Sequence, residues 1–440
     1  MDKIKKILVF MFTLILLGVA LGSITPLFER KASYEKYADF FDEREDIDVW
    51  FLGSSHMLNA VFPMQLWKDY GIVSYNFGGH SSQIATSYWV MENALNYKTP
   101  KVVVIDGYLL SSEWKASDIF SYLHLSFDAF PISKTKIMAV NDLLNDEGLE
   151  KSIQDGTARQ SDEKRTKIGL LWNFSVYHSR WNELTKNDFN PAVNLEKGAE
   201  SRVGICKANK TDKISTYSWN NETTAEVYLR RIIEECQARN IRVVLTYLPY
   251  VADETGWEEA ERLSAIAKEY DLQYLDFLDL DIVDYETDFY NFGHLNPSGA
   301  RKVTDYCGKI LSEGYGLEDR RSQESYVGWN KDYYEYEEYC DNLFRKSETL
   351  DEYLMLTSSS KVAAEIKTSN DMVLNNTYFK KLCDNTKAAG NELSIKTGNY
   401  SNLVDITISR NGKVIDRVSF DVELVDGSFS TVECTRQEEE

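Results

Sequence analysis

The sequence predicts an α/β fold, a three-layer sandwich with a parallel, flavodoxin-like sheet, a large insertion and a small C-terminal module. Residues 101–106 hold four apolar residues in succession, which is typical of a parallel strand buried on both faces. Similar short apolar runs at residues 47–52 and 241–247 alternate with segments of helical period. With 440 residues, of which 43% are hydrophobic, the chain is long enough for a full α/β domain and a second module.

The elements expected in the α/β domain, residues 47–315, follow one another in doubly wound order. After the first strand at 47–52 come a helix at 63–69, a strand at 72–75, a helix at 81–96, the strand at 101–106, a helix at 223–239, a strand at 241–247, a helix at 254–270, a strand at 273–277 and a helix at 297–311. Pro297 suits the first turn of the last helix, where a missing N–H costs nothing. Residues 108–221 are too long for one crossover connection, so we expect an insertion with its own helices.

The C-terminal part has a different character. Residues 316–350 are acidic and rich in tyrosine, which predicts a linker or a partly helical bridge. Residues 351–435 carry short alternating runs at 362–367, 392–396, 403–409 and 414–422, with Arg410-Asn411-Gly412 as a hairpin turn. This pattern predicts a small β-rich or α+β module with a role in packing or binding.

The N-terminus predicts where the chain works. Lys3, Lys5 and Lys6 precede residues 7–28, which carry no charge and are about the ~20 residues that span a bilayer as a helix. Basic residues on the short side keep that end cytoplasmic, so the body is expected outside a cell membrane crossed once. The alternative is a cleaved signal at residues 1–28, with Ala20 and Gly22 as the small residues of the site, and a secreted body. Residues 29–46 are expected to form a helix or stalk.

Charge and cysteine usage narrow the function classes. The formal net charge of −21 argues against nucleic acid as a partner, because the field of the protein repels polyanions. The six cysteines are scattered, with no C-x-x-C pair and no histidine at metal-ligand spacing. The sequence therefore predicts neither a zinc site nor a disulfide framework, although a pair such as Cys340 with Cys383 stays open. No cofactor is expected.

Polar residues with catalytic potential follow the first two strands and precede the last helix. Ser54 and Ser55 come directly after the first strand, at the sheet edge where open α/β folds carry their chemistry. His294, before the last helix, is the only histidine in the last 260 residues. A serine hydroxyl needs a base within hydrogen-bond reach and a third group to orient that base. The competing interpretations are a serine that caps the next helix and a loop histidine without a chemical role.

These motifs resemble the SGNH/GDSL hydrolase superfamily over roughly residues 45–315. Gly-Ser-Ser after the first strand, Asn76-Phe77-Gly78-Gly79 after the second and the N-x-x-H loop carry the resemblance. The chain is most similar to the membrane-anchored branch associated with O-acylation of alginate and teichoic acid. The resemblance implies Ser55 as nucleophile, His294 as base, and an oxyanion site formed by the N–H groups of Ser55 and of Gly78 or Gly79, with Gly79 preferred.

The chain departs from that family at two places. Asn291 stands where the family has aspartate, so its amide must orient His294, unless Asp288 takes this role across a bent loop. The family's third-block asparagine has no match, because Ile105-Asp106-Gly107-Tyr108 occupies its place. Both departures bear on whether the protein turns over a substrate at all.

Two functions follow as expectations. The resemblance implies an extracytoplasmic serine acyltransferase or esterase acting on O-acyl groups, acetyl first among them, of a cell-surface polysaccharide, with a membrane-bound O-acyltransferase as partner. The alternative is a catalytically silent scaffold that binds glycan or assembles that transferase. In the insertion, His178, Arg180 and Trp181 suit binding of an acidic sugar, or an aromatic helix face packed on the core. His56 and His80 are expected to be solvated or packing residues.

Overall fold

A five-stranded parallel sheet forms the centre of the larger domain. The computed structural model describes residues 2–29, 31–161, 164–190, 193–213, 221–425 and 428–437. The strand order is β2-β1-β3-β4-β5, the flavodoxin-like order, and every neighbouring pair is parallel. The strands are β1 Val49–Leu52, β2 Ser74–Asn76, β3 Val102–Asp106, β4 Arg242–Tyr247 and β5 Gln273–Asp276. The predicted α/β class is confirmed.

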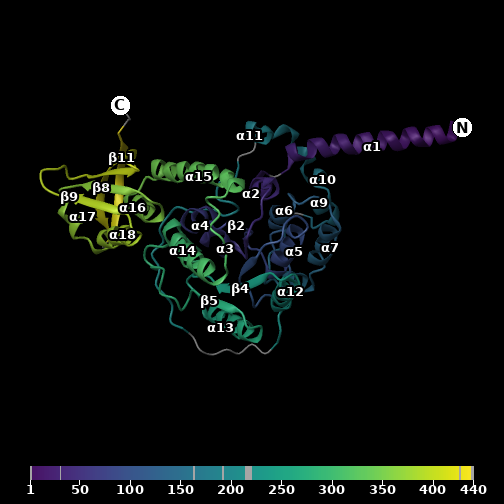
Figure 1. Ribbon diagram of the computed structural model, residues 1–440, viewed down its shortest axis with the longest axis horizontal. Coiled ribbons are helices and arrows are strands. Elements are labelled where there is room, and N and C mark those ends of the chain that lie inside the picture. The colour runs from purple at the N-terminus through teal and green to yellow at the C-terminus, as the bar shows by residue number, and fades with distance from the viewer. Residues whose placement is uncertain are drawn as a thin grey trace.

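Helices cover both faces of this sheet and create two cores (Figure 1). Val103 and Ile105 of β3 face the core shared with α5 (Ile84–Ala94), α12 (Thr224–Ala238) and α13 (Glu254–Glu269). Val102 and Val104 face the core shared with α4 (Pro63–Tyr70) and α14 (Pro297–Gly314). The alternation follows from the two-residue period of a strand, and it explains why the apolar run is continuous.

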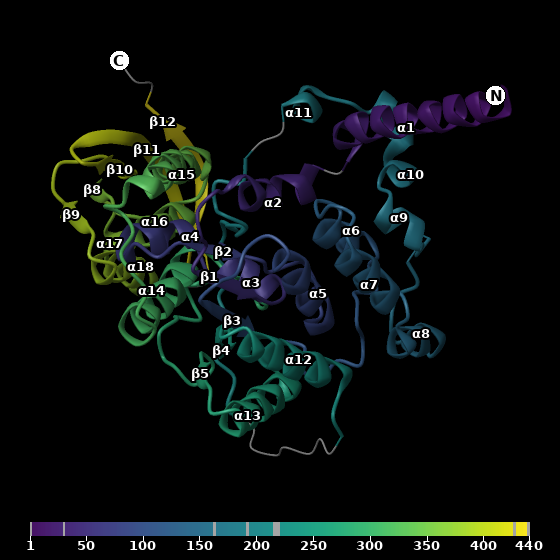
Figure 2. The same ribbon diagram turned by 45° about the vertical axis from the view of Figure 1, so that its right-hand side comes forward.

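The insertion between β3 and α12 is helical, as expected for a connection of this length. Its elements are α6 Ser121–Phe127, α7 Lys134–Leu143, α8 Glu147–Gln154, α9 Lys167–Leu171, α10 Phe174–Tyr177, the 3-10 helix η1 His178–Asn182 and α11 Lys186–Phe189. Figures 1 and 2 both show α7, α9 and α10 on the side of the molecule where the N-terminal helix leaves it.

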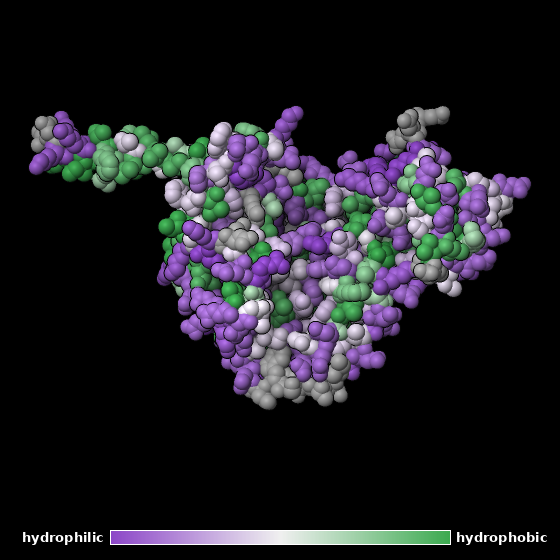
Figure 3. All heavy atoms as spheres, turned by 180° about the vertical axis from the view of Figure 1, so that it is seen from behind, coloured by the Kyte–Doolittle hydropathy of each residue, from purple (hydrophilic) through white to green (hydrophobic). Residues whose placement is uncertain are grey.

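The N-terminal helix α1 (Asp2–Phe28) projects from the body, and residues 3–28 are long and apolar enough to cross a membrane. Figure 3 shows its hydrophobic surface without cover from the body along most of its length. The segment predicted as a helix or stalk forms α2 (Lys31–Asp42), which packs against the core through Tyr37 and Phe40. Both rings are fully buried, so α2 belongs to the body and does not stand apart from it.

The acidic segment that follows α14 is also largely helical. It forms η2 (Glu324–Tyr326) and α15 (Val327–Lys346), whose Trp329 and Tyr336 are buried against the α/β core. The pattern predicted a bridge, and the buried rings show why this bridge is ordered: one face of α15 is aromatic and the other acidic.

The C-terminal module is an α+β unit built on a second five-stranded sheet of order β12-β11-β10-β8-β9. Its elements are α16 Leu350–Ser359, β8 Ala363–Lys367, α17 Asp371–Asn375, α18 Thr377–Ala388, β9 Glu392–Lys396, β10 Val404–Arg410, β11 Lys413–Val425 and β12 Ser428–Arg436. The predicted hairpin joins β10 and β11, with Asn411 and Gly412 at φ of 51° and 79°. Two successive residues at positive φ are what a type I′ turn requires.

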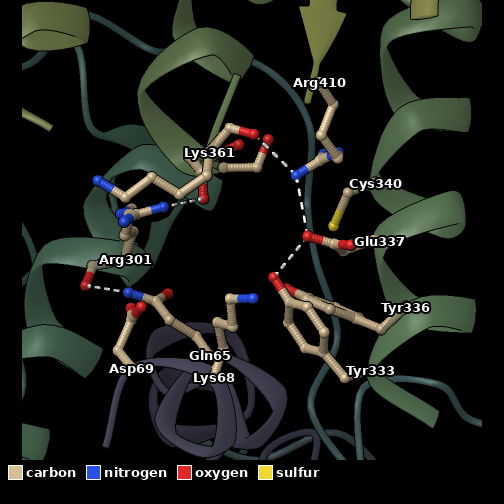
Figure 4. Close-up of a pocket in the computed structure, with 12 residues that line it drawn as sticks. Gln65, Lys68, Asp69, Arg301, Tyr333, Tyr336, Glu337, Cys340, Lys361 and Arg410 are labelled. Atoms are coloured by element: carbon tan, nitrogen blue, oxygen red, sulfur yellow. Dashed lines mark hydrogen bonds and ion pairs between the residues drawn. The ribbon is translucent and has the colours of Figure 1, made fainter. Parts of the chain in front are cut away.

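Ion pairs and hydrogen bonds fix this module to the α/β domain. Arg410 of β10 contacts the carboxylates of Asp341 and Glu337 on α15, at 2.8 and 3.2 Å. Arg301 of α14 donates to the backbone oxygen of Ser359, at the end of α16. Figure 4 shows Arg301, Glu337 and Arg410 around a small cavity between α4, α14, α15 and the module. Polar groups around the cavity bind one another, as Arg410 does with Glu337 and Arg301 with Ser359, so we assign them to packing of the module.

Candidate active site

The two serines after β1 have different positions. Ser54 caps α3 (Ser55–Ala60), and its Oγ accepts a hydrogen bond from the backbone N–H of His56 at 3.2 Å. Gly53, at a φ of 153°, makes the turn out of the strand, and a Cβ there would meet the Cβ atoms of Asp106 and Met57 at 3.0 Å. The capping function expected of a serine here therefore belongs to Ser54, which leaves the Ser55 hydroxyl free for another partner.

That partner is His294, which lies at hydrogen-bond distance although it is 239 residues away in sequence. Ser55 Oγ and His294 Nε2 are 2.8 Å apart. His294 begins β7 (His294–Leu295), the second strand of a hairpin with β6 (Phe289–Asn291). The hairpin and the N-terminus of α14 hold the imidazole at the carboxyl edge of the parallel sheet, beside the turn that carries Ser55. The side chains of Ser55 and His294 therefore converge, as predicted.

Asn291 fixes the tautomer of this histidine. Its Oδ1 accepts the backbone N–H of Gly293 at 2.9 Å, which identifies that atom as the oxygen of the amide. The same oxygen lies 2.9 Å from His294 Nδ1, so Nδ1 carries the proton and donates it to Asn291. The lone pair of Nε2 is then directed at the Ser55 hydroxyl. The arrangement is a serine, a base and an orienting amide in hydrogen-bond contact.

The imidazole of His294 is held neutral. Burial, helped by the positive charge of Arg202, lowers the pKa of His294 to about 4. A neutral imidazole accepts a proton from a hydroxyl, whereas a protonated one does not.

Asp288 does not orient the histidine. Its carboxylate is fully buried and binds Lys302 Nζ at 2.6 Å, Ser298 Oγ at 2.9 Å and the backbone N–H of Asp284 at 2.7 Å. These partners tie the loop to the start of α14. The expectation that Asp288 substitutes for the missing aspartate is corrected, because its oxygens are already occupied by structural donors.

The glycine block after β2 also differs from the expected arrangement. The N–H of Gly78 donates to Asn76 Oδ1 at 2.8 Å, and the N–H of Gly79 donates to the carbonyl of Gly53 at 3.1 Å. Neither N–H is free to stabilise an oxyanion. The expectation that Gly78 or Gly79 provides an oxyanion donor is therefore corrected. Gly78 is needed for packing, since a Cβ there would meet the backbone N of Leu58 at 2.5 Å. The N–H of Ser55 has no acceptor among the described residues.

Three side chains from separate parts of the sequence, His80, Glu200 and Arg202, act electrostatically on His294. His80 Nε2 lies 3.1 Å from Glu200 Oε2, and Arg202 Nη2 lies 3.2 Å from Glu200 Oε1. Arg202 also lies over the ring of Tyr290, directly before Asn291. The Nε of Arg202 is buried and has no hydrogen-bond partner in the described part of the chain. Glu200 and Arg202 come from the end of the insertion, where no motif pointed to them.

His56 and Asp106 lie beneath the site. His56 is buried, stacks on Tyr108 at 3.7 Å between ring centroids and meets His294 edge-on at 5.6 Å. Burial lowers its pKa to about 3, which makes His56 the packing residue that was expected. Asp106, in place of the third block, accepts the N–H of Leu248, while its Oδ2 has no partner among the described residues. Burial raises the pKa of Asp106 to about 7.

A cavity of about 170 Å³ lies beside the glycine block. Gly79, His80 and Glu200 line it on the side of the site, and Lys36 and Tyr37 of α2 line it on the other. The buried Lys36 ammonium donates to the carbonyls of Gly78 and Gly198, and burial lowers its pKa to about 7. The helix that follows the apolar α1 therefore forms one wall of the space next to the candidate site.

The three insertion residues proposed for sugar binding lie elsewhere. Arg180 Nη1 donates to the carbonyls of Phe28 and Glu29 at 2.7 and 2.8 Å, at the C-terminal end of α1. His178 Nδ1 contacts the carbonyl of Ser175, and Trp181 is largely exposed. Figures 1 and 2 show α10, which η1 continues, beside α1 and away from α3. We therefore assign Arg180 to the end of α1 and not to a substrate.

No group of three or more His, Cys, Asp or Glu side chains within the described ranges is arranged to hold a metal ion. All six cysteines are free thiols, Cys340 and Cys383 included.

Comparison with known proteins adds a distant likeness to solved structures. No protein-family model matches the chain, and no curated protein matches it. A solved structure from Desulfitobacterium hafniense DCB-2, described as a lipolytic protein of the G-D-S-L family, resembles it with 14% sequence identity and a TM-score of 0.31. That likeness covers 60% of this chain and 100% of the other. The geometry of the site therefore carries the functional assignment.

Proposed function

We propose that the protein is an extracytoplasmic serine esterase or acyltransferase of the SGNH type, with Ser55 as nucleophile, His294 as base and Asn291 as the group that orients the base. One observation carries this proposal: a continuous hydrogen-bonded relay from Ser55 Oγ to His294 Nε2 at 2.8 Å and from His294 Nδ1 to Asn291 Oδ1 at 2.9 Å. Each member comes from a separate motif, and the three together have the geometry that nucleophilic catalysis requires.

The reaction follows from the relay. Ser55 Oγ attacks the carbonyl carbon of an ester as its proton passes to His294 Nε2. The tetrahedral intermediate collapses when the protonated imidazole returns that proton to the departing alkoxide, which leaves an acyl group on Ser55. Water or an acceptor hydroxyl, deprotonated by the same histidine, then takes the acyl group and restores the serine. Water as acceptor makes the protein an esterase, and a sugar hydroxyl makes it a transferase.

Stabilisation of the oxyanion needs donors other than the glycine block. The N–H of Ser55 is the first donor. Arg202 is the second that we propose, because its buried Nε lacks an acceptor and its charge acts on His294. A guanidinium would replace the asparagine that the resembled family provides, with a full positive charge facing the developing negative charge.

The substrate class that we propose is an O-acyl group, acetyl first among them, on a cell-surface polysaccharide. This class comes from the resemblance to the O-acylation branch, and the cavity of about 170 Å³ beside Gly79 and His80 offers space for part of a substrate next to the relay. The apolar α1 supports a location at a membrane, and a membrane-bound O-acyltransferase would be the partner on the donor side. With the residues after α1 outside, the polymer and the site share a compartment.

One observation favours a second candidate, a silent scaffold that binds glycan or assembles the transferase. Asn291 orients His294 but offers no negative charge to stabilise the imidazolium formed in the transition state. The N–H groups of Gly78 and Gly79 already have acceptors, which also favours the scaffold.

Covalent labelling separates the two functions. The wild-type protein should react with a fluorophosphonate and hydrolyse a small acetyl ester, and Ser55→Ala and His294→Ala should each abolish both reactions. Ser54→Ala is the matched control, because Ser54 is the neighbouring serine and caps α3. Wild-type protein that resists the label and hydrolyses nothing, while Ser55→Ala still supports surface acylation in cells, would establish the scaffold.

A further inference from the structure

The insertion holds the end of α1 where it leaves the apolar stretch. Arg180 donates to the last carbonyls of the helix, and the rings of Phe28 and Phe174 meet edge-on at 5.9 Å between centroids. Asn173 Nδ2 donates to the carboxylate of Glu29 at 3.1 Å. Contacts of α1 with α10, η1 and α11 complete this junction. These contacts join the end of α1 to the insertion.

Large apolar side chains are exposed on the same side of the body. Ile132 and Ile168 are each 65% exposed, and Trp172 is 46% exposed. Further exposed members of this surface are Ile137 and Met138 of α7 and Val176 of α10. We call these six residues the α7–α9–α10 surface. Figures 1 and 2 show α7, α9 and α10 on the side of the body that lies next to the C-terminal half of α1. Figure 3 shows hydrophobic residues along the same side of the body. A contiguous patch of exposed apolar residues is typical of a site that binds another protein or a membrane.

An apolar groove separates this surface from α1. It measures about 690 Å³ and runs between Gly18 and Gly22 of α1 and Ile132 and Trp172 of the body. Several polar side chains that line it have partners: Lys136 Nζ donates to the carbonyl of Phe130, Asp128 contacts His124 and Tyr177, and Asn173 Nδ2 donates to Glu29. The buried Oδ1 of Asn173 has no partner among the described residues. The groove therefore presents mainly hydrocarbon for an occupant to contact.

The depth of the groove follows from helix geometry. Gly18 lies ten residues before Phe28, and a rise of about 1.5 Å per residue puts it about 15 Å along α1 from that end. Residues 7–28 carry no charge, so Gly18 and Gly22 lie inside the stretch that a bilayer would cover. Ile132 and Trp172 line the same groove as Gly18 and Gly22, so a bilayer around this part of α1 would extend to the groove.

We propose that the α7–α9–α10 surface is embedded in the outer leaflet of the membrane and that the groove holds an acyl chain of a leaflet lipid. Continuity with α1 selects lipid as the occupant, since the same depth of bilayer surrounds both. Trp172 matches the preference of tryptophan for the membrane interface. The net charge of −21 means that apolar contact, and not attraction to anionic lipid, holds the surface there. The inference goes beyond the catalytic function and does not depend on it.

Photocrosslinking in nanodiscs tests the embedded surface. The full-length protein, with p-benzoylphenylalanine in place of Ile168, is placed in nanodiscs of palmitoyl-oleoyl phosphatidylcholine and irradiated. Mass spectrometry then identifies the molecules that are crosslinked to position 168. The matched control has the same residue in place of Val432 of β12, which is 58% exposed in the C-terminal module. We expect lipid adducts at position 168 in several-fold excess over position 432. Disc-bound protein with equal lipid adducts at both positions, or with adducts only to a second protein molecule, overturns the proposal.

A pair of leucine substitutions tests the groove. Gly22→Leu should fill it without a clash, because a Cβ at Gly22 meets no atom within 4 Å. Ala20→Leu, about 200° around the helix from Gly22, adds comparable volume on the other face. Native mass spectrometry of protein released from the discs should show one retained phospholipid fewer for Gly22→Leu and no change for Ala20→Leu. Equal lipid retention by Gly22→Leu and the unsubstituted chain would refute a lipid-filled groove.

Discussion

The amide oxygen of Asn291 lies 2.9 Å from Nδ1 of His294 and accepts the backbone N–H of Gly293 at the same distance. Because the second bond identifies the oxygen, the amide selects the histidine tautomer whose Nε2 accepts from Ser55. An aspartate in this place would select the same tautomer and add a negative charge. The geometry of the relay is therefore complete, while the charge that stabilises a protonated imidazole is missing.

Asn291→Asp should raise esterase turnover, because a carboxylate beside Nδ1 stabilises the imidazolium of the transition state. Acetyl-ester hydrolysis measured against the unsubstituted protein checks this. Asn291→Ala, which removes the orienting oxygen, should lower turnover by about 10² or more, in line with other losses of tautomer control. Equal rates for all three proteins would show that position 291 does not act on the base.

The pH–rate profile should be flat from neutrality down to about pH 5 and fall below that. Burial and the charge of Arg202 lower the pKa of His294 to about 4, so the imidazole remains an unprotonated base over this range. The acid limb of kcat/KM reports this group in the free enzyme. Asn291→Asp should move the acid limb to higher pH, because a negative charge favours the protonated form. A limb at pH 6–7 in the unsubstituted protein would contradict a buried, electropositive environment for His294.

Arg202→Gln should lower kcat and move the acid limb of the profile upward. The guanidinium lowers the pKa of His294, so its removal raises that pKa, and it also removes the proposed oxyanion donor. Losing one such donor costs about 10²–10³ in kcat in a well-studied protease. Arg202→Lys keeps the charge without the planar donor set, so it should restore the position of the acid limb but not the full kcat. A change in KM alone would assign Arg202 to substrate binding.

Ser54→Ala should lower the free energy of unfolding by about 1 kcal/mol, the usual loss for a helix N-cap, and leave fluorophosphonate labelling intact. Urea denaturation and labelling of the same preparation measure both effects. Ser55→Ala should show the reverse, with little change in stability and no label. Labelling that follows Ser54 and not Ser55 would exchange the roles of the two residues.

Protease added to intact cells should digest the body of the protein. Lys3, Lys5 and Lys6 precede the uncharged stretch, which favours a cytoplasmic N-terminus and an external body. Lysed cells provide the control for cleavable sites. Protection in intact cells, with digestion only after lysis, would place the body on the cytoplasmic side.

Most of the central sheet could be predicted from sequence because strands buried on both faces need continuous apolar runs, as in β3. Ser55 and His294 could be predicted because each lies next to the end of a recognisable element. The six-residue helix α3 was missed, since it is too short to show a period. It decides which serine caps the helix and which contacts His294.

Other parts of the site could not be predicted for physical reasons. Glu200 and Arg202 reach His294 from the end of an irregular insertion, and no local pattern marks them. The glycine block suggested an oxyanion site, but the N–H groups of Gly78 and Gly79 are needed by the turn that holds the block in place. Arg180 and Trp181 had a composition that suits a sugar, and only the fold shows that Arg180 binds the carbonyls at the end of α1.

The junction between α1 and the body sets where Ser55 lies relative to the apolar helix. Arg180 binds the carbonyls at the end of α1, while Lys36 of α2 donates to the carbonyl of Gly78, in the glycine block beside Ser55. With α1 in a bilayer and these contacts kept, Ser55 would work at one height above the lipid. A polymer would have to pass through that thin layer to be modified. Chain segments farther out would escape, so the distance of a sugar unit from the membrane, as well as its chemistry, would decide whether it is acylated.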